Sequence, residues 1–111
     1  MNIEQLRDYC LSKPYAGESM PFGDDTLVFK VKTKMFALAN LEGPLRINLK
    51  CDPELALELR ERYRAVVPGY HMNKKHWNSV IINGSISDDK IIEWIDHSYE
   101  VVCKTLPGTK K

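Results

Sequence analysis

The stretch TLVFKVKTKMFALANLEGPLRINLK, residues 26–50, decides the fold, because it contains two runs in which apolar and polar side chains alternate. In Thr26–Lys32 and in Leu45–Lys50 every second residue is apolar, which is typical of a strand with one face against a core. The intervening run, Met35–Leu41, is mostly apolar. Short connections join the three runs, at Thr33-Lys34 and at Glu42-Gly43-Pro44. The pattern therefore predicts three strands that pair as an antiparallel meander.

Helical patterns surround this meander, and each begins at a residue that commonly caps a helix. The first is expected from Asn2 to Lys13-Pro14, the second from Asp52-Pro53 to Pro68-Gly69, and the third from Ser87 to Pro107-Gly108. Apolar stripes predict the buried faces of the last two helices: Leu55, Leu59, Tyr63 and Val66 in one, and Ile92, Ile95, Tyr99, Val102, Cys103 and Leu106 in the other.

Two further segments complete the predicted topology. Residues 16–23 are expected to form a connection or a short first strand, and Trp77–Ile82 a strand that stops at Asn83-Gly84. We predict an α+β fold in which an antiparallel sheet carries about three helices on one face, as a single domain spanning residues 1–111.

Composition limits the classes of protein that the chain can belong to. Hydrophobic residues make up 43% and charged residues 28%, and the formal net charge is +1. A nucleic-acid binder of this composition needs an uneven distribution of its charges. Three widely spaced cysteines without a C-x-x-C motif indicate reduced thiols. The sequence shows no signal peptide and no apolar run near the roughly 20 residues of a membrane span, so a cytoplasmic protein without membrane association is expected.

The alternation segregates positive charge onto one face of the predicted sheet. If the apolar residues of the strands face the helices, four cations face the opposite way, with no acidic residue among them: Lys30, Lys32, Arg46 and Lys50. Lys34 is added at the tip of the hairpin. Such a face can follow a phosphate backbone, but it is also what an ordinary solvated strand face looks like, made polar partly to prevent aggregation.

The block Pro68–Ile82 places cations, amides and an aromatic ring at the start of a strand. Its central residues are Asn73, Lys74, Lys75, His76 and Trp77. They could contact phosphates and stack a base. The alternative is structural: Trp77 anchors the core, and the lysines solvate a loop.

Catalytic and metal sites find little support in the sequence. His71 and His76 are five residues apart, His97 is distant, and a metal site needs three or four ligands in suitable geometry. The cysteines Cys10, Cys51 and Cys103 have no neighbouring base, and no Gly-rich phosphate loop is present. We expect no enzyme activity, no metal and no cofactor.

Four segments resemble the MmcQ/YjbR family of small bacterial proteins, and the resemblance runs over essentially the whole chain. They are Met20-Pro-Phe-Gly23, Val31–Leu38, Ile47–Glu54 and, most specifically, Pro68–Asn78 with its Met-Asn-Lys-x-His-Trp pattern. The resemblance implies an α+β fold similar to that of CyaY, the frataxin-like fold. It also implies DNA binding, since the family is often described as DNA-binding through a double-wing arrangement of hairpins. The iron binding that a frataxin-like fold suggests is not carried over, because the first helix offers only Glu4 and Asp8.

The leading hypothesis is a DNA-binding domain that contacts phosphates through the hairpin around Thr33-Lys34, the basic sheet face and the Asn73–Trp77 loop. The near-neutral charge implies weak, salt-dependent binding or dependence on a protein partner of unknown identity, by a monomer or weak dimer. The alternative is a protein-interaction or small-ligand-binding module without a nucleic-acid role, in which Tyr70–Trp77 border a pocket between sheet and helices.

Overall fold

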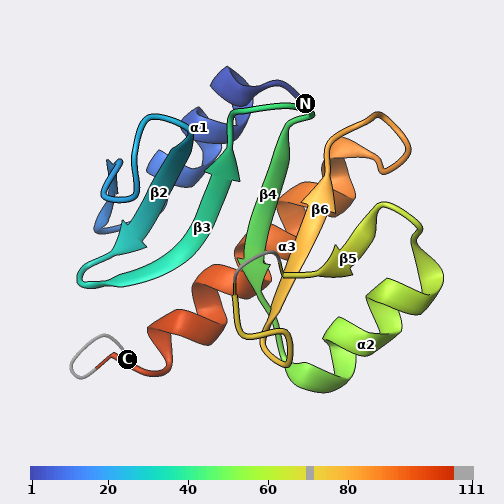
Figure 1. Ribbon diagram of the computed structural model, residues 1–111. Coiled ribbons are helices and arrows are strands. Elements are labelled where there is room, and N and C mark those ends of the chain that lie inside the picture. Colours follow the sequence, from blue (N-terminus) through green and yellow to red (C-terminus); the bar gives the residue numbers. More distant parts are fainter. Residues whose placement is uncertain (70–71, 107–111) are drawn as a thin grey trace.

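The computed structural model describes residues 1–69 and 72–106, which form a six-stranded antiparallel sheet with three helices packed against it (Figure 1). The predicted fold class is confirmed. The strands are β1 (Ala16–Ser19), β2 (Thr26–Val31), β3 (Lys34–Asn40), β4 (Arg46–Lys50), β5 (Val66–Pro68) and β6 (Trp77–Ile81). The helices are α1 (Ile3–Leu11), α2 (Pro53–Arg62) and α3 (Asp88–Cys103). Within the sheet the order is β1-β2-β3-β4-β6-β5, so the predicted meander forms its centre.

All three predicted helix starts are confirmed. The Asn2 side chain accepts a hydrogen bond from the backbone N–H of Gln5, and the Gln5 side chain accepts one from the backbone N–H of Asn2, which completes a capping box. Asp52 and Ser87 likewise cap α2 and α3 through their side-chain oxygens. Each side chain satisfies a donor that the first helical turn leaves without a partner.

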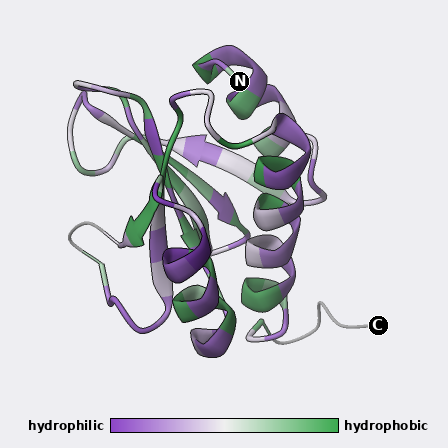
Figure 2. Cartoon of the chain, turned by 90° about the vertical axis from the view of Figure 1, so that its right-hand side faces the viewer, coloured by the Kyte–Doolittle hydropathy of each residue, from purple (hydrophilic) through white to green (hydrophobic). Residues whose placement is uncertain are grey.

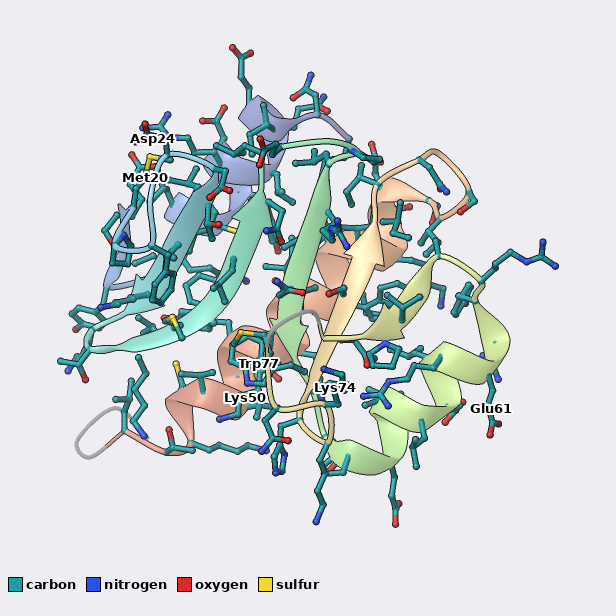
Figure 3. All side chains as sticks on the ribbon, in the orientation of Figure 1. Met20, Asp24, Lys50, Glu61, Lys74 and Trp77 are labelled. Atoms are coloured by element: carbon teal, nitrogen blue, oxygen red, sulfur yellow. The ribbon has the colours of Figure 1, made fainter. Side chains whose placement is uncertain are left out.

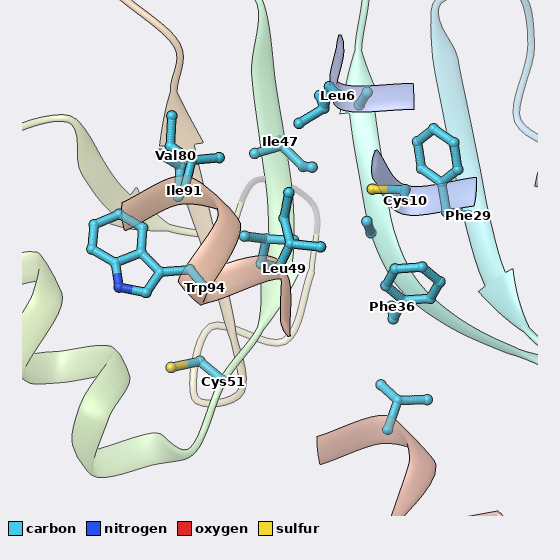
Figure 4. Close-up of a cluster of buried hydrophobic side chains, with 14 of the residues drawn as sticks. Leu6, Cys10, Phe29, Phe36, Ile47, Leu49, Cys51, Val80, Ile91 and Trp94 are labelled. Carbon is cyan, nitrogen blue, oxygen red and sulfur yellow. The ribbon is translucent and has the colours of Figure 1, made fainter. Parts of the chain in front are cut away.

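The main core lies between the sheet and the helices, and Figure 2 shows the helices gathered on one side of the sheet. Phe29, Phe36, Ile47 and Leu49 contribute its sheet side, and Leu6 of α1 contributes from the helical layer (Figure 4). Helix α3 buries a stripe that differs in part from the predicted one: Ile91, Trp94, Ile95, Ser98 and Val102. Three residues of the predicted stripe are only half-buried, namely Ile92, Tyr99 and Cys103.

The second helix is shorter than predicted. It ends at Arg62, and Tyr63 is already extended, with φ −120° and ψ 121°. The segment predicted to be its last turns instead forms β5, an edge strand that pairs antiparallel with β6. Val66 fits an apolar helical stripe and an inward strand position equally well, and pairing with β6 decides between them.

The hairpin between β2 and β3 departs from a simple alternation at two places. Strand β2 ends at Val31, so Lys32 lies in the turn with a positive φ of 57°, and its ammonium lies 4.9 Å from the ring centre of Tyr15. Phe36 is an extra residue in β3, because Phe29 pairs with Ala37 but Lys30 pairs with Met35. Such a bulge bends the strand locally.

Where β3 and β4 separate beyond the Ala37–Leu49 pair, α3 supplies the missing hydrogen bonds. Ser98, which is 0% exposed, accepts a hydrogen bond from the backbone N–H of Lys50 (2.9 Å) and donates one to the Phe36 carbonyl (2.6 Å). One hydroxyl thus satisfies backbone groups of two different strands. Among the helices of the described chain, none combines the length and apolar character of a transmembrane span.

Candidate nucleic-acid interface

The sheet face opposite the helices, here called the open face, carries several of the predicted binding residues. Strand register forms two cation–apolar pairs on it: Lys30 opposite Met35 in β2 and β3, and Lys50 opposite Trp77 in β4 and β6. Figure 3 shows Lys50 and Trp77 together at the same end of β4 and β6. The two pairs lie on either side of the place where β3 and β4 separate.

Both pairs line a hollow of ≈ 480 Å³, which we call the lysine groove. Its lining combines three lysines with apolar side chains, one of them from α3: Lys30, Lys34, Lys50, Phe22, Met35, Trp77 and Val102 of α3. No carboxylate lies among its described lining residues. The groove therefore combines positive charge with apolar surface, as sites for single-stranded nucleic acid do.

None of the ion pairs found among residues 1–69 and 72–106 involves a lysine of the groove. Those pairs lie in the helical layer and at the edges of the molecule: Met1–Asp88, Arg7–Glu18, Lys13–Asp96, Arg62–Glu58 and Lys90–Glu93. The charges of the groove are therefore available to an anionic ligand.

A second hollow of ≈ 210 Å³, which we call the amide pocket, adjoins the groove. Its lining includes Asn40 and Asn48, and it shares Phe22 and Met35 with the groove. Ser79 donates a hydrogen bond to Asn48 Oδ1, and Asn48 Nδ2 donates to Asn40 Oδ1 at 3.3 Å. Asn48 is only 3% exposed, so this chain of hydrogen bonds is part of the structure rather than a solvated surface.

Trp77 is not a free stacking surface. Its side chain is 7% exposed and packs with Val28 and Leu38 in a small core on the open face, which Met35 and Met72 border. The packing thus supports the interpretation in which Trp77 anchors a core. The alternative hypothesis placed a pocket between sheet and helices, bordered by Tyr70–Trp77. Within this block, His76 borders a hollow of ≈ 580 Å³ together with residues of α2 and α3, and Trp77 borders the lysine groove. Tyr70 lies outside the described residues.

The Asn73–Trp77 loop is held by backbone contacts rather than presented as a row of free side chains. Asn73 organises it, because its carbonyl accepts from the Trp77 N–H (3.0 Å) and its side chain accepts from the Lys75 N–H (2.9 Å). The His76 carbonyl accepts from the Cys51 N–H at 2.7 Å, and His76 itself is half-buried. Lys74 and Lys75 are exposed, and Lys74 Nζ lies 3.4 Å from the Gly69 carbonyl.

Arg60 of α2 fixes this loop, a role that the sequence did not reveal. Its Nε donates to Asn78 Oδ1 at 2.6 Å, while Nη2 donates to the Lys74 carbonyl and reaches the Trp77 carbonyl at 3.4 Å. In the sequence Arg60 is one of several charged residues of α2, so its contacts with the loop become evident only from the structure.

Replacing Arg60 by alanine is therefore expected to lower the free energy of unfolding by about 1–3 kcal/mol, because several acceptors lose a charged donor. Urea denaturation measures the change. Arg62→Ala is the matched control: it removes the same charge from the same helix but only an exposed ion pair with Glu58, which contributes less than about 0.5 kcal/mol. Equal losses in both variants would contradict the assigned role of Arg60.

The remaining predicted cations are spread more widely than expected. Lys32 belongs to the turn rather than to the wall of the sheet, because β2 ends one residue earlier than predicted. Arg46 lies at the other end of β4 from Lys50, opposite Asn40 and Ile81. Of the four cations predicted to share one face, the structure brings together only Lys30 and Lys50, joined by Lys34 from the start of β3.

Burial lowers the acidity of two cysteines. Desolvation raises the pKa of the Cys10 thiol to about 12 and that of Cys51 to about 11, so both are protonated near neutral pH. Within the described ranges no group of three His, Cys, Asp or Glu side chains could hold a metal ion. His71, named above as a potential ligand, lies outside those ranges.

Comparisons with known proteins identify the family. A family model described as YjbR matches residues 11–101. The chain is 36% identical over its full length to the uncharacterised YjbR protein of Escherichia coli K12, of which it covers 95%, and 39% identical over 89% of its length to uncharacterised YbdF of E. coli O157:H7, of which it covers 82%.

Solved structures agree. A crystal structure of a Deinococcus radiodurans protein with the family-model domain DUF419 superimposes with a TM-score of 0.89 at 36% identity, covering 99% of this chain and 95% of that one. A Pseudomonas syringae protein superimposes with a TM-score of 0.80 at 31% identity, covering 91% and 98%. The match in sequence and in structure extends along nearly the entire chain, and the protein belongs to the YjbR family.

Proposed function

We propose that the protein binds DNA through the open face of its sheet, with the lysine groove contacting phosphates. One observation carries the proposal: Lys30, Lys34 and Lys50 line one groove without a carboxylate among its described lining residues. The groove opens on the sheet face opposite the helices, and α3 contributes Val102 to its lining. Phosphate contacts supply most of the affinity of a sequence-independent nucleic-acid binder.

The distribution of charge supports this orientation. Acidic side chains are frequent in α3, on the opposite side of the sheet: Asp88, Asp89, Glu93, Asp96 and Glu100. The net charge is only +1, so long-range attraction by the whole molecule is small and the local field of the groove has to orient the DNA. Binding of modest affinity with a marked salt dependence follows from this arrangement.

The test removes two lysines of the groove and compares the result with an equal loss of charge elsewhere. The double variant Lys30→Gln, Lys50→Gln is expected to bind fluorescein-labelled single-stranded and duplex DNA about tenfold more weakly, because two phosphate contacts are lost. The slope of log affinity against log salt should fall by roughly 0.7–0.9 per contact. Fluorescence anisotropy at several salt concentrations gives both quantities.

The control variant is Arg62→Gln, Lys90→Gln, which changes the net charge by the same amount at residues that face the helical side. Its affinity and salt slope should stay close to those of the original protein. Absence of binding by the original protein at low salt would refute the proposal. If both double variants bound DNA equally more weakly than the original protein, the groove would not be the DNA-binding site.

A further inference from the structure

We infer that the ligand of the open face is a single strand, and that one of its bases enters the amide pocket while neighbouring phosphates contact the lysine groove. This inference rests on the proposed DNA binding and specifies how the strand is held. The two hollows share Phe22 and Met35, so a ligand that fills both crosses these side chains without leaving the surface. A nucleotide joins a flat ring system to an anionic phosphate. The ring suits the mainly apolar amide pocket, and the phosphate suits the adjoining lysine groove.

The chemistry of the amide pocket fits the edge and the faces of a nucleobase. Met35, Leu38 and Met72 provide apolar walls, and methionine adapts readily to a flat ring. The hydrogen-bond chain from Ser79 through Asn48 ends at Asn40, whose Oδ1 is used and whose Nδ2 donates to no residue in the described chain. The pocket thus presents an amide donor, which pairs with the carbonyl oxygens and ring nitrogens that bases expose.

Phe22 is placed to stack on a base at the boundary of the two hollows. Phe22 is 62% exposed, although large apolar side chains are usually buried. Trp77, by contrast, is buried beneath the groove and shapes its floor. Among the described lining residues of the two hollows, Phe22 is therefore the exposed aromatic side chain that can stack a base.

Size and accessibility favour a single strand over a duplex. The amide pocket of ≈ 210 Å³ is smaller than the roughly 300–1,000 Å³ of a site for a drug-sized ligand, so it suits one ring system. In a duplex the bases are stacked and paired, and a base has to be extruded before it can enter a pocket. A single strand meets no such cost, so a base reaches the pocket directly.

The experiment separates recognition of bases from recognition of phosphates. Binding of a single-stranded oligodeoxynucleotide is compared by anisotropy with binding of an abasic strand of the same length, for the original protein and for Phe22→Ala. We expect the original protein to prefer the base-bearing strand by about tenfold, as stacking of one base provides. Phe22→Ala should lose this preference, keep its affinity for the abasic strand, and leave the salt slope unchanged. Phe22→Tyr, which retains a stacking ring, should restore the preference.

Leu57→Ala serves as the control, since Leu57 is another exposed large apolar side chain (58%) but lies on α2. It should bind both strands as the original protein does. If the original protein binds the abasic strand as tightly as the base-bearing one, base recognition is refuted while phosphate binding by the groove stands. If it binds neither strand at low salt, the proposed DNA binding itself fails. A preference for bases that survives in Phe22→Ala would overturn the role of Phe22 and of the pocket that it borders.

Discussion

Replacing Trp77 by alanine is expected to lower the free energy of unfolding by about 3–5 kcal/mol, the usual range when a large buried aromatic side chain is removed. Trp77 is 7% exposed although it lies on the sheet face opposite the helices. Its neighbours Val28 and Leu38 are buried largely by its own ring and by Met35 and Met72. No second layer can close over the gap, so truncation exposes these side chains to water.

Urea or thermal denaturation followed by circular dichroism measures this loss. Phe22→Ala is the matched control, because it removes an aromatic ring from the same face but one that is 62% exposed. Its free energy of unfolding should change by less than about 0.5 kcal/mol, as is usual for surface substitutions. A similar small change in Trp77→Ala would show that the small core of the open face contributes little to folding.

The features that sequence predicted well are those set by local chemistry. Asn2, Asp52 and Ser87 begin the helices as expected, because a cap needs only its own side chain and the N–H groups of the next turn. The meander was recognised from the two alternating runs in residues 26–50 and the short connections between its strands. In these segments local preference and tertiary packing agree.

The features that sequence missed depend on distant partners. β5 exists because β6 offers it a hydrogen-bonding edge, whereas the spacing of Tyr63 and Val66 also continues the apolar stripe of the helix. Lys32 does not lie on the predicted basic face, because β2 ends at Val31, one residue earlier than predicted, and Lys32 is part of the turn. A shift of one residue moves a side chain to the other face of a sheet or into a turn. This one-residue error therefore gives Lys32 a different position from the one predicted.

The candidate site shows the same division. Period-two alternation predicts Lys30 and Lys50 on the face away from the helices, and in the structure both lysines line the same groove. The roles of Phe22 and Arg60 could not be anticipated, since each acts on residues far away in sequence: Phe22 lies beside β3, and Arg60 beside the loop before β6. The segment Met20–Gly23 carried the family resemblance, but its contribution to the hollows needed the arrangement in space.

Replacing Ser98 by alanine is expected to be the other strongly destabilising change, with a loss of about 2–4 kcal/mol. Its hydroxyl links Lys50 N–H and the Phe36 carbonyl where β3 and β4 separate. Alanine leaves the buried Phe36 carbonyl and the partly buried Lys50 N–H without this partner, and an unsatisfied buried group costs about 1–3 kcal/mol. The higher helix propensity of alanine offsets only about 0.5 kcal/mol of this loss.

Ser12→Ala is the control, because the Ser12 hydroxyl also donates to a backbone carbonyl, that of Tyr9, but at an exposed helix end where water can replace it. Its stability should change by less than about 0.5 kcal/mol. Hydrogen exchange gives a local measurement: the amide of Lys50 should exchange much faster in Ser98→Ala, whereas that of Leu49, one residue before it, should follow the global stability. An unchanged exchange rate at Lys50 would show that another acceptor replaces the hydroxyl. The same substitution connects stability to the proposed site, since Ser98 holds the backbone from which the Lys50 side chain enters the groove.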